Sequence, residues 1–207
     1  MKLPLPASAR AAVENAVTSA VRPIGGALRD RRPGPDASLV RRPNLDVPAT
    51  IALTSPAFAD GDEIPARFCG IGIGEGLSPA LDWAGVPEGT QRLLLVLEDR
   101  DAPLADRTLV HAAAVLDARG GEGSLAEGAF TPRNRRLAWV RAARGPLGRA
   151  YRAPRPLPGH GEHRYVFHVF AIDTPITPPA DADLDTLVRA LVGRVTARGE
   201  LTGTRGA

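Results

Sequence analysis

Two long apolar runs constrain the fold of this chain more than any other feature. Residues 92–99 read RLLLVLED and residues 163–172 read HRYVFHVFAI. Successive side chains of a β-strand point to opposite faces, so a strand that is apolar at consecutive positions buries both faces. The first run therefore predicts an internal strand. The second run is rich in β-branched and aromatic residues and predicts another strand.

The rest of the pattern places strands before a helix. Short strands are predicted at residues 50–54, 64–68, 81–83 and 108–116. Leucines and valines between residues 184 and 199 recur at helical spacing and predict a helix. The 22 glycines and 20 prolines among 207 residues favour turns and loops. Because the strands do not alternate with helices, the predicted class is mostly antiparallel β with helices near the termini.

Residues 1–48 are predicted to be an N-terminal extension in front of a main domain at 49–207. A helix is predicted at 6–22, and Pro23 is expected to weaken its continuation. Residues 30–48 are charged and proline-punctuated, which indicates a linker or an extended wrap. A short apolar helix is weakly stable alone, so it should pack on the main domain or on a second copy, in a homodimer. Its apolar stripe, at i, i+4 spacing, comprises Ala9, Val13, Val17 and Val21.

Composition and charge argue against several classes of protein. The single cysteine, Cys69, leaves no intramolecular disulfide and no cysteine-rich metal site. No run of 18 apolar residues is present, so no membrane-spanning helix is expected. A net charge of +3 is too small to indicate a nucleic-acid binder. Arg10 and Glu14 interrupt any apolar segment near the N-terminus, so no secretory signal is expected and the predicted location is cytoplasmic.

Neither a cofactor nor a catalytic nucleophile is expected. The glycines between residues 70 and 76 are followed by Ser78-Pro79, whereas a dinucleotide fingerprint requires a helix directly after its glycines. No P-loop and no G-x-S-x-G motif occur, and Cys69 has no evident base. These observations favour a protein that is not an enzyme.

The histidines do not form a recognisable metal motif. His160 and His163 have H-x-x-H spacing, but the prolines and glycines around them disfavour the helix that would put both on one face. In the strand that follows, alternation sends His163 and His168 to opposite faces. No metal site is therefore expected.

Two other segments carry candidate functional groups. Asp99 and Asp101 close the first apolar run; such a carboxylate is either a turn former or points into a pocket and fixes an imidazole. The chain's only tyrosines, Tyr151 and Tyr165, bracket a proline-rich loop that leads into the second run. Rigid loops held on a sheet are where ligand-binding groups concentrate.

Several motifs in a fixed order resemble the phosphatidylethanolamine-binding protein family, in its bacterial Raf kinase inhibitor-like branch. The resemblance covers residues 50–204, and the extension lies outside it. The motifs are TSPAFADG (54–61), SPALDW (78–83), GVPEGT (85–90), DRDAP (99–103), Val110-His111, PRPLPGHGEHRY (154–165) and LTGT (201–204).

The resemblance implies a β-sandwich of two antiparallel sheets, of Greek-key type, with a C-terminal helix. It also implies a small, metal-free anion pocket for phosphate, or for the phosphorylated headgroup or partner that carries it. The site residues carried over are Asp99, Asp101, His111, His163 and Tyr165, with Pro156 in the wall loop and Arg155 as an additional candidate. Asp99 would hydrogen-bond one imidazole and leave the other N–H of that ring facing the ligand.

The sequence departs from the family pattern at positions near this pocket. Arg100 replaces a proline, Arg155 replaces a small residue or cysteine, Ala112 replaces an aromatic residue, and Arg152-Ala153 replaces a glycine pair. By the resemblance, the Ala102–Pro103 peptide bond is a candidate for the cis form. The first hypothesis is a non-enzymatic anion-binding protein; the alternatives are a weak hydrolase with a His–Asp pair and an interaction module with a vestigial pocket.

Overall fold

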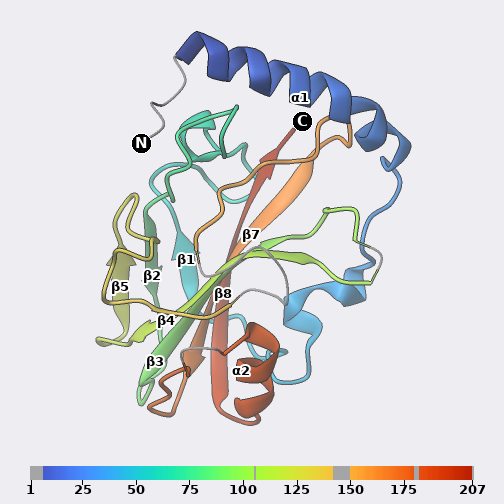
Figure 1. The fold of residues 1–207 in the computed structure, drawn as a ribbon. Helices are drawn as coiled ribbons and strands as arrows, with labels where there is room; N and C mark the ends of the chain where they lie inside the picture. Colours follow the sequence, from blue (N-terminus) through green and yellow to red (C-terminus); the bar gives the residue numbers. More distant parts are fainter. Residues whose placement is uncertain (1–6, 105, 142–149, 180–181, 207) are drawn as a thin grey trace.

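The protein folds into two antiparallel sheets that face each other (Figure 1). The computed structural model describes residues 7–104, 106–141, 150–179 and 182–206. The smaller sheet has the strand order β1-β2-β5, with β1 at Ala52–Thr54, β2 at Leu81–Ala84 and β5 at Glu122–Leu125. The larger sheet has the order β6-β4-β3-β7-β8, with β6 at Ala138–Trp139, β4 at Leu109–Asp117, β3 at Arg92–Asp99, β7 at His163–Ile172 and β8 at Val195–Arg205. The predicted mostly β, two-sheet fold is confirmed.

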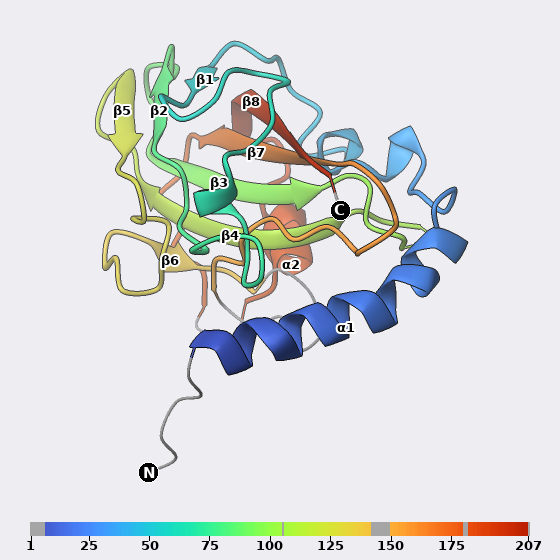
Figure 2. The same cartoon turned by 90° about the horizontal axis from the view of Figure 1, so that it is seen from above.

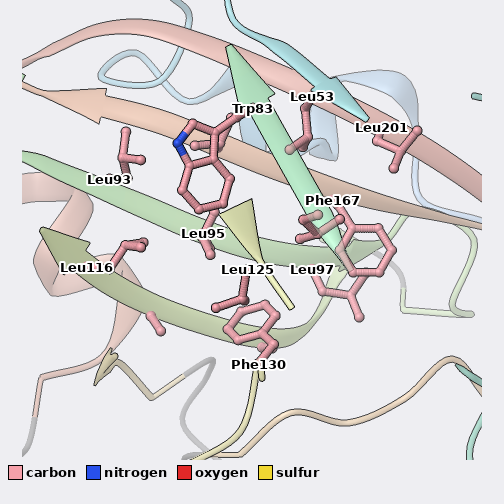
Figure 3. Packing of buried hydrophobic residues seen from close by; sticks show 14 of the residues in the cluster. Leu53, Trp83, Leu93, Leu95, Leu97, Leu116, Leu125, Phe130, Phe167 and Leu201 are labelled. Atoms are coloured by element: carbon pink, nitrogen blue, oxygen red, sulfur yellow. The ribbon is translucent and has the colours of Figure 1, made fainter. Parts of the chain in front are cut away.

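The main core lies between the two sheets (Figure 3). Trp83 of the small sheet lies over Leu95 of β3, and Leu97 of β3 and Phe167 of β7 belong to the same cluster. The odd-numbered residues of β3 and β7 share this face because side chains alternate along a strand. Burial of these large side chains is the main source of stability for the sandwich.

A second core covers the opposite face of the large sheet. Leu94 and Val96 of β3 and Phe170 of β7 lie there. They pack against the helix α2, Leu184–Ala190, and against Leu39, Val40 and Leu45 of the N-terminal region. Strands β3 and β7 are thus covered on both faces, which explains why their sequences are apolar at consecutive positions.

The N-terminal helix is longer than predicted. Helix α1 runs from Ala7 to Ala27 and includes Pro23, where the sequence predicted an end near residue 22. Pro23 removes one backbone donor, but the turn after it is held by packing, since Gly25 is buried against the 158–160 segment. Residue 6 and the side chain of Val13, both part of the prediction, lie outside the described part of the chain.

The C-terminal helix is shorter than predicted. The helix predicted at 184–199 ends at Ala190, and the chain continues as β8 along β7. Gly193, with φ of +65°, reverses the chain direction between them. Two further predictions are wrong. The strand predicted at 64–68 is a 3₁₀ turn at Ala66–Phe68, after Pro65, which has no N–H for a ladder, and the described peptide bonds, including Ala102–Pro103, are all trans.

Helix α1 lies outside both sheets, across the end of the sandwich opposite α2 (Figures 1 and 2). The loop that enters β7 passes beneath it (Figure 1). Further 3₁₀ turns at Pro35–Ala37 and Leu39–Arg41 lead from α1 to the second core. Within the described residues, no helix combines the length and apolarity that crossing a membrane requires.

Candidate functional site

The end of β3 and the start of β7 bring the predicted site residues together. Asp99 is paired directly with Tyr165 across these strands, and His163 lies two positions before Tyr165 on the same face. A β-bulge in β4 leaves His111 without a partner between the pairs Leu97–Ala112 and Glu98–Val110. The bulge turns the His111 ring toward this face, where it meets Tyr165 edge-on at 5.5 Å between ring centroids.

Asp99 both forms the turn after β3 and contacts an imidazole. Its Oδ1 accepts hydrogen bonds from the backbone N–H groups of Asp101 and Ala102, both at 2.9 Å, which forms the turn. Its Oδ2 lies 2.9 Å from Nδ1 of His163 and 3.8 Å from Nε2 of His111. Burial alone would raise the pKa of Asp99, but the two imidazoles outweigh burial and hold it well below its usual range. Asp99 is therefore ionised.

Two polar atoms beside Asp99, Nε2 of His111 and the hydroxyl of Tyr165, are buried without a hydrogen bond of ordinary geometry. Both still interact with Asp99, and the hydroxyl also interacts with the Arg155 backbone. Nδ1 of His111 lies 3.0 Å from the Arg152 carbonyl oxygen, so this nitrogen carries a hydrogen and donates it. Burial and the Asp99 charge raise the pKa of Tyr165, which keeps its hydroxyl protonated.

His163 does not direct a free N–H toward a ligand, contrary to expectation. Its Nδ1 faces Asp99, and its Nε2 lies 2.8 Å from Nδ1 of His160. Nε2 of His160 in turn lies 3.3 Å from the carbonyl oxygen of Arg31, in the N-terminal region. The three contacts form a chain from Asp99 to that region.

This chain needs one proton more than two neutral imidazoles carry. Asp99 and the Arg31 carbonyl can only accept, so each end requires an N–H, and the contact between His160 and His163 requires a third. Two neutral rings supply two N–H groups. When all three hydrogen bonds form, the pair of rings therefore carries one positive charge, which balances the charge of Asp99. His160 is not among the predicted site residues. Its H-x-x-H spacing from His163 indicates a shared face in a helix, whereas here a turn before β7 brings the two rings together.

Asp101 lies in the same turn but points toward arginines. Its oxygens accept three hydrogen bonds from Arg164, through the backbone N–H, Nε and Nη2, at 2.8 to 2.9 Å. Nη1 of Arg32 lies 2.7 Å from Oδ1 of Asp101, the oxygen that also accepts from Nη2 of Arg164. Burial opposes the ionised form, but these arginine contacts outweigh it and lower the pKa of Asp101. Asp101 thus ties the N-terminal region to the start of β7.

A cavity of about 310 Å³ opens beside His163, and we call it the α1 cavity. Arg155 and Pro156 line it, together with Val17 and Val21 of α1. A larger cavity of about 500 Å³ lies elsewhere and contacts none of the four converging residues Asp99, His111, His163 and Tyr165. Within the described residues, no three metal-ligating side chains are grouped so that they could hold an ion.

Two departures from the family pattern leave this site unobstructed. The Arg100 side chain turns away and bonds Glu98 and Glu200 at 3.2 and 3.3 Å. Ala112 points into the main core between the sheets.

Comparison with known proteins identifies the chain's relatives. The family model described as phosphatidylethanolamine-binding protein matches residues 54–206. A UPF0098 protein of Aquifex aeolicus is 31% identical over 159 residues, which are 75% of this chain and 88% of that protein.

Two solved structures agree with this match. One is described as a phosphatidylethanolamine-binding protein homologue of Chlamydia trachomatis, with a TM-score of 0.61, 29% identity, and 75% of this chain and 97% of that one covered. The other is an E. coli protein described as a new member of the mammalian PEBP family, with a TM-score of 0.64, 27% identity, and 77% and 99% covered. The order of motifs, the two-sheet fold and these matches agree, and the chain belongs to the phosphatidylethanolamine-binding protein family.

Proposed function

We propose that this chain is a non-enzymatic binding protein for a small phosphate-type anion, held between His111 and Tyr165. The observation that carries the proposal is the pair of buried polar atoms on these two residues that lack a hydrogen bond of ordinary geometry. Buried polar groups are nearly always hydrogen-bonded, so two neighbouring exceptions favour a ligand that supplies the missing partner. The phosphate would belong to a free compound, a headgroup or a phosphorylated partner.

The charges around the two atoms support an anion. Asp99 is negative, and one extra proton shared by His160 and His163 would balance it when all three hydrogen bonds of the chain form. Nδ1 of His111 already donates to the Arg152 carbonyl, so Nε2 carries a hydrogen only when the ring is protonated. The site then has a net charge of about +1, with an imidazolium N–H and a phenolic O–H as donors, and hydrogen bonds from a charged donor to an oxyanion are strong.

Other features support binding over catalysis. Burial raises the pKa of the Cys69 thiol, which makes this thiol a poor nucleophile. Both nitrogens of His163 are engaged, so the His163–Asp99 pair has no free nitrogen to act as a general base.

The test is a calorimetric titration with sulfate, whose charge does not change between mildly acidic and mildly basic pH. We expect Tyr165→Phe to weaken binding about tenfold, since one hydrogen bond to a charged group is lost. Tyr151→Phe is the matched control because its hydroxyl is also buried and unpartnered but packs beside Phe130 in the main core. Equal losses in both variants, or no binding by the unmodified protein, would contradict the proposal.

The same titration tests His111 as the second donor. His111→Gln should weaken sulfate binding, because the imidazole Nε2 that faces the site is removed. An affinity that this substitution leaves unchanged would count against His111 as the donor.

A further inference from the structure

The α1 cavity combines one charged residue with an otherwise largely apolar wall. Val17 and Val21 of α1 form one side, and Pro103, Leu157 and Pro158 lie on the other. Among the described residues that line the cavity, Arg155 alone has a permanent charge. His163 also lines it, but both of its ring nitrogens are already hydrogen-bonded.

Helix α1 is seated on the body by close backbone contacts. A Cβ on Gly25 would lie 2.0 Å from the Pro158 carbonyl oxygen, and a Cβ on Gly159 would lie 2.3 Å from the Arg22 carbonyl oxygen. Only glycine allows backbones to approach so closely. The contacts of Arg32 with the Glu162 carbonyl and with Asp101 hold the next residues on the same rim. The helix is thus a fixed wall of the cavity.

This wall is absent from the part of the chain that matches its relatives. The family model begins at residue 54, and α1 ends at residue 27. The two solved relatives are covered over 97% and 99% of their length, although they cover only 75% and 77% of this chain. A ligand that contacts α1 would therefore distinguish this chain from them.

Size and polarity together indicate the occupant. An apolar cavity of about 150 Å³ is enough to bind benzene, and the α1 cavity has about 310 Å³. It has room for one ring and an adjoining anionic group, but not for two long acyl chains. Apolar side chains would contact the ring, and Arg155, beside Tyr165 in the fold, would contact the anionic end.

We propose that the occupant is a phosphate monoester with one apolar substituent about the size of a phenyl ring, which lies under α1. This inference rests on the proposed anion function and names the kind of phosphate compound that the site accepts. Helix α1 then acts as the part of the cavity that selects for the substituent, while Arg155 contacts the phosphate.

The test compares inorganic phosphate with phenyl phosphate by calorimetry on the full chain. Burial of the ring should make phenyl phosphate bind at least about tenfold more tightly. Val21→Asn, which places an amide in the apolar wall, should abolish this advantage of phenyl phosphate over inorganic phosphate. Ile24→Asn is the matched control, because Ile24 is on the same helix, is 56% exposed and does not line the cavity. Circular dichroism of both variants checks that the helix persists.

The outcomes separate the two proposals. If inorganic phosphate binds and phenyl phosphate binds no more tightly, the inference about α1 is wrong and the anion function stands. The inference is also wrong if Val21→Asn and Ile24→Asn behave alike, or if dibutanoyl phosphatidylethanolamine, a phosphodiester, binds more tightly than phenyl phosphate. If neither phosphate compound binds, the anion function itself is contradicted.

Discussion

Glu98 joins the N-terminal region to the large sheet through one fully buried carboxylate. Its oxygens accept hydrogen bonds from the Leu39 backbone at 2.7 Å, from Nε2 of His168 at 2.9 Å, and from Thr108 and Arg100. Burial raises the pKa of Glu98, but the bonds from His168, Thr108 and Leu39 outweigh burial and lower it from about 4.5 to about 2. A buried carboxylate with this many donors is costly to protonate or remove.

The depressed pKa of Glu98 predicts a loss of stability in acid. The carboxylate of the unfolded chain titrates near its ordinary value, so the stabilisation is complete above about pH 4.5 and is lost as pH falls toward about 2. The shift corresponds to about 3 kcal/mol in the free energy of unfolding. In urea denaturation, Glu98→Gln should lose about this amount at neutral pH and flatten the acid limb. Glu127→Gln, in an exposed pair with Arg67, should change it by less than about 0.5 kcal/mol; similar effects of both substitutions would contradict this role.

At the scale of elements, the contact between α1 and the wall loop predicts opposite effects at two adjacent glycines. Gly26→Ala should stabilise the protein by up to about 1 kcal/mol, because alanine favours the helix and nothing lies within 4 Å of its Cβ. Gly25→Ala has the same intrinsic gain, but its Cβ would meet the Pro158 carbonyl at 2.0 Å, so the helix must lift. We expect faster hydrogen exchange in α1 and a lower free energy of unfolding for Gly25→Ala. Equal protection in both variants would show that the end of α1 is not seated on the loop.

The bounds of an element could be predicted where the pattern of its apolar residues matches its surroundings in the fold, and not where the two differ. The predicted bounds of β3 and β7 match the structure, because strands covered on both faces need uninterrupted apolar side chains. The predicted end of the C-terminal helix was wrong. Leu191, Val192 and Val195 fit helical spacing, but the chain turns at Gly193 and continues as β8. Within the site, Asp99, His111 and Tyr165 were all predicted from the resemblance. The pairing of β3 with β7 places Asp99 opposite Tyr165, whereas His111 reaches them through a bulge that no sequence pattern indicated.

At the scale of the whole molecule, the N-terminal region has two parts: one lines the α1 cavity, and the other contributes side chains to the second core. Helix α1 lies over the α1 cavity, and its exposed residues include Val17 and Ile24. The segment from residue 39 to residue 45, in contrast, contributes Leu39, Val40 and Leu45 to the second core. The sequence predicts either a linker or an extended wrap for residues 30–48. Leu39 and Leu45 of this segment are fully buried, which supports the extended wrap.

Two truncations should therefore separate ligand selection from stability. Removal of residues 1–27 deletes α1 and its contact with the wall loop but keeps the second core. The melting temperature should therefore fall by less than in the longer truncation, while the advantage of phenyl phosphate over inorganic phosphate disappears. Removal of residues 1–48 also deletes the three buried side chains, worth about 5 kcal/mol together, and the backbone donor of Leu39 to Glu98. The melting temperature of that chain should fall by several times the few degrees that the loss of each kcal/mol is expected to cause. Light scattering on both forms records whether the mass halves, which would assign part of the loss to a homodimer. Equal melting temperatures for the full chain and the chain without residues 1–48 would show that residues 49–207 fold as an independent domain and that the wrap adds nothing to their stability.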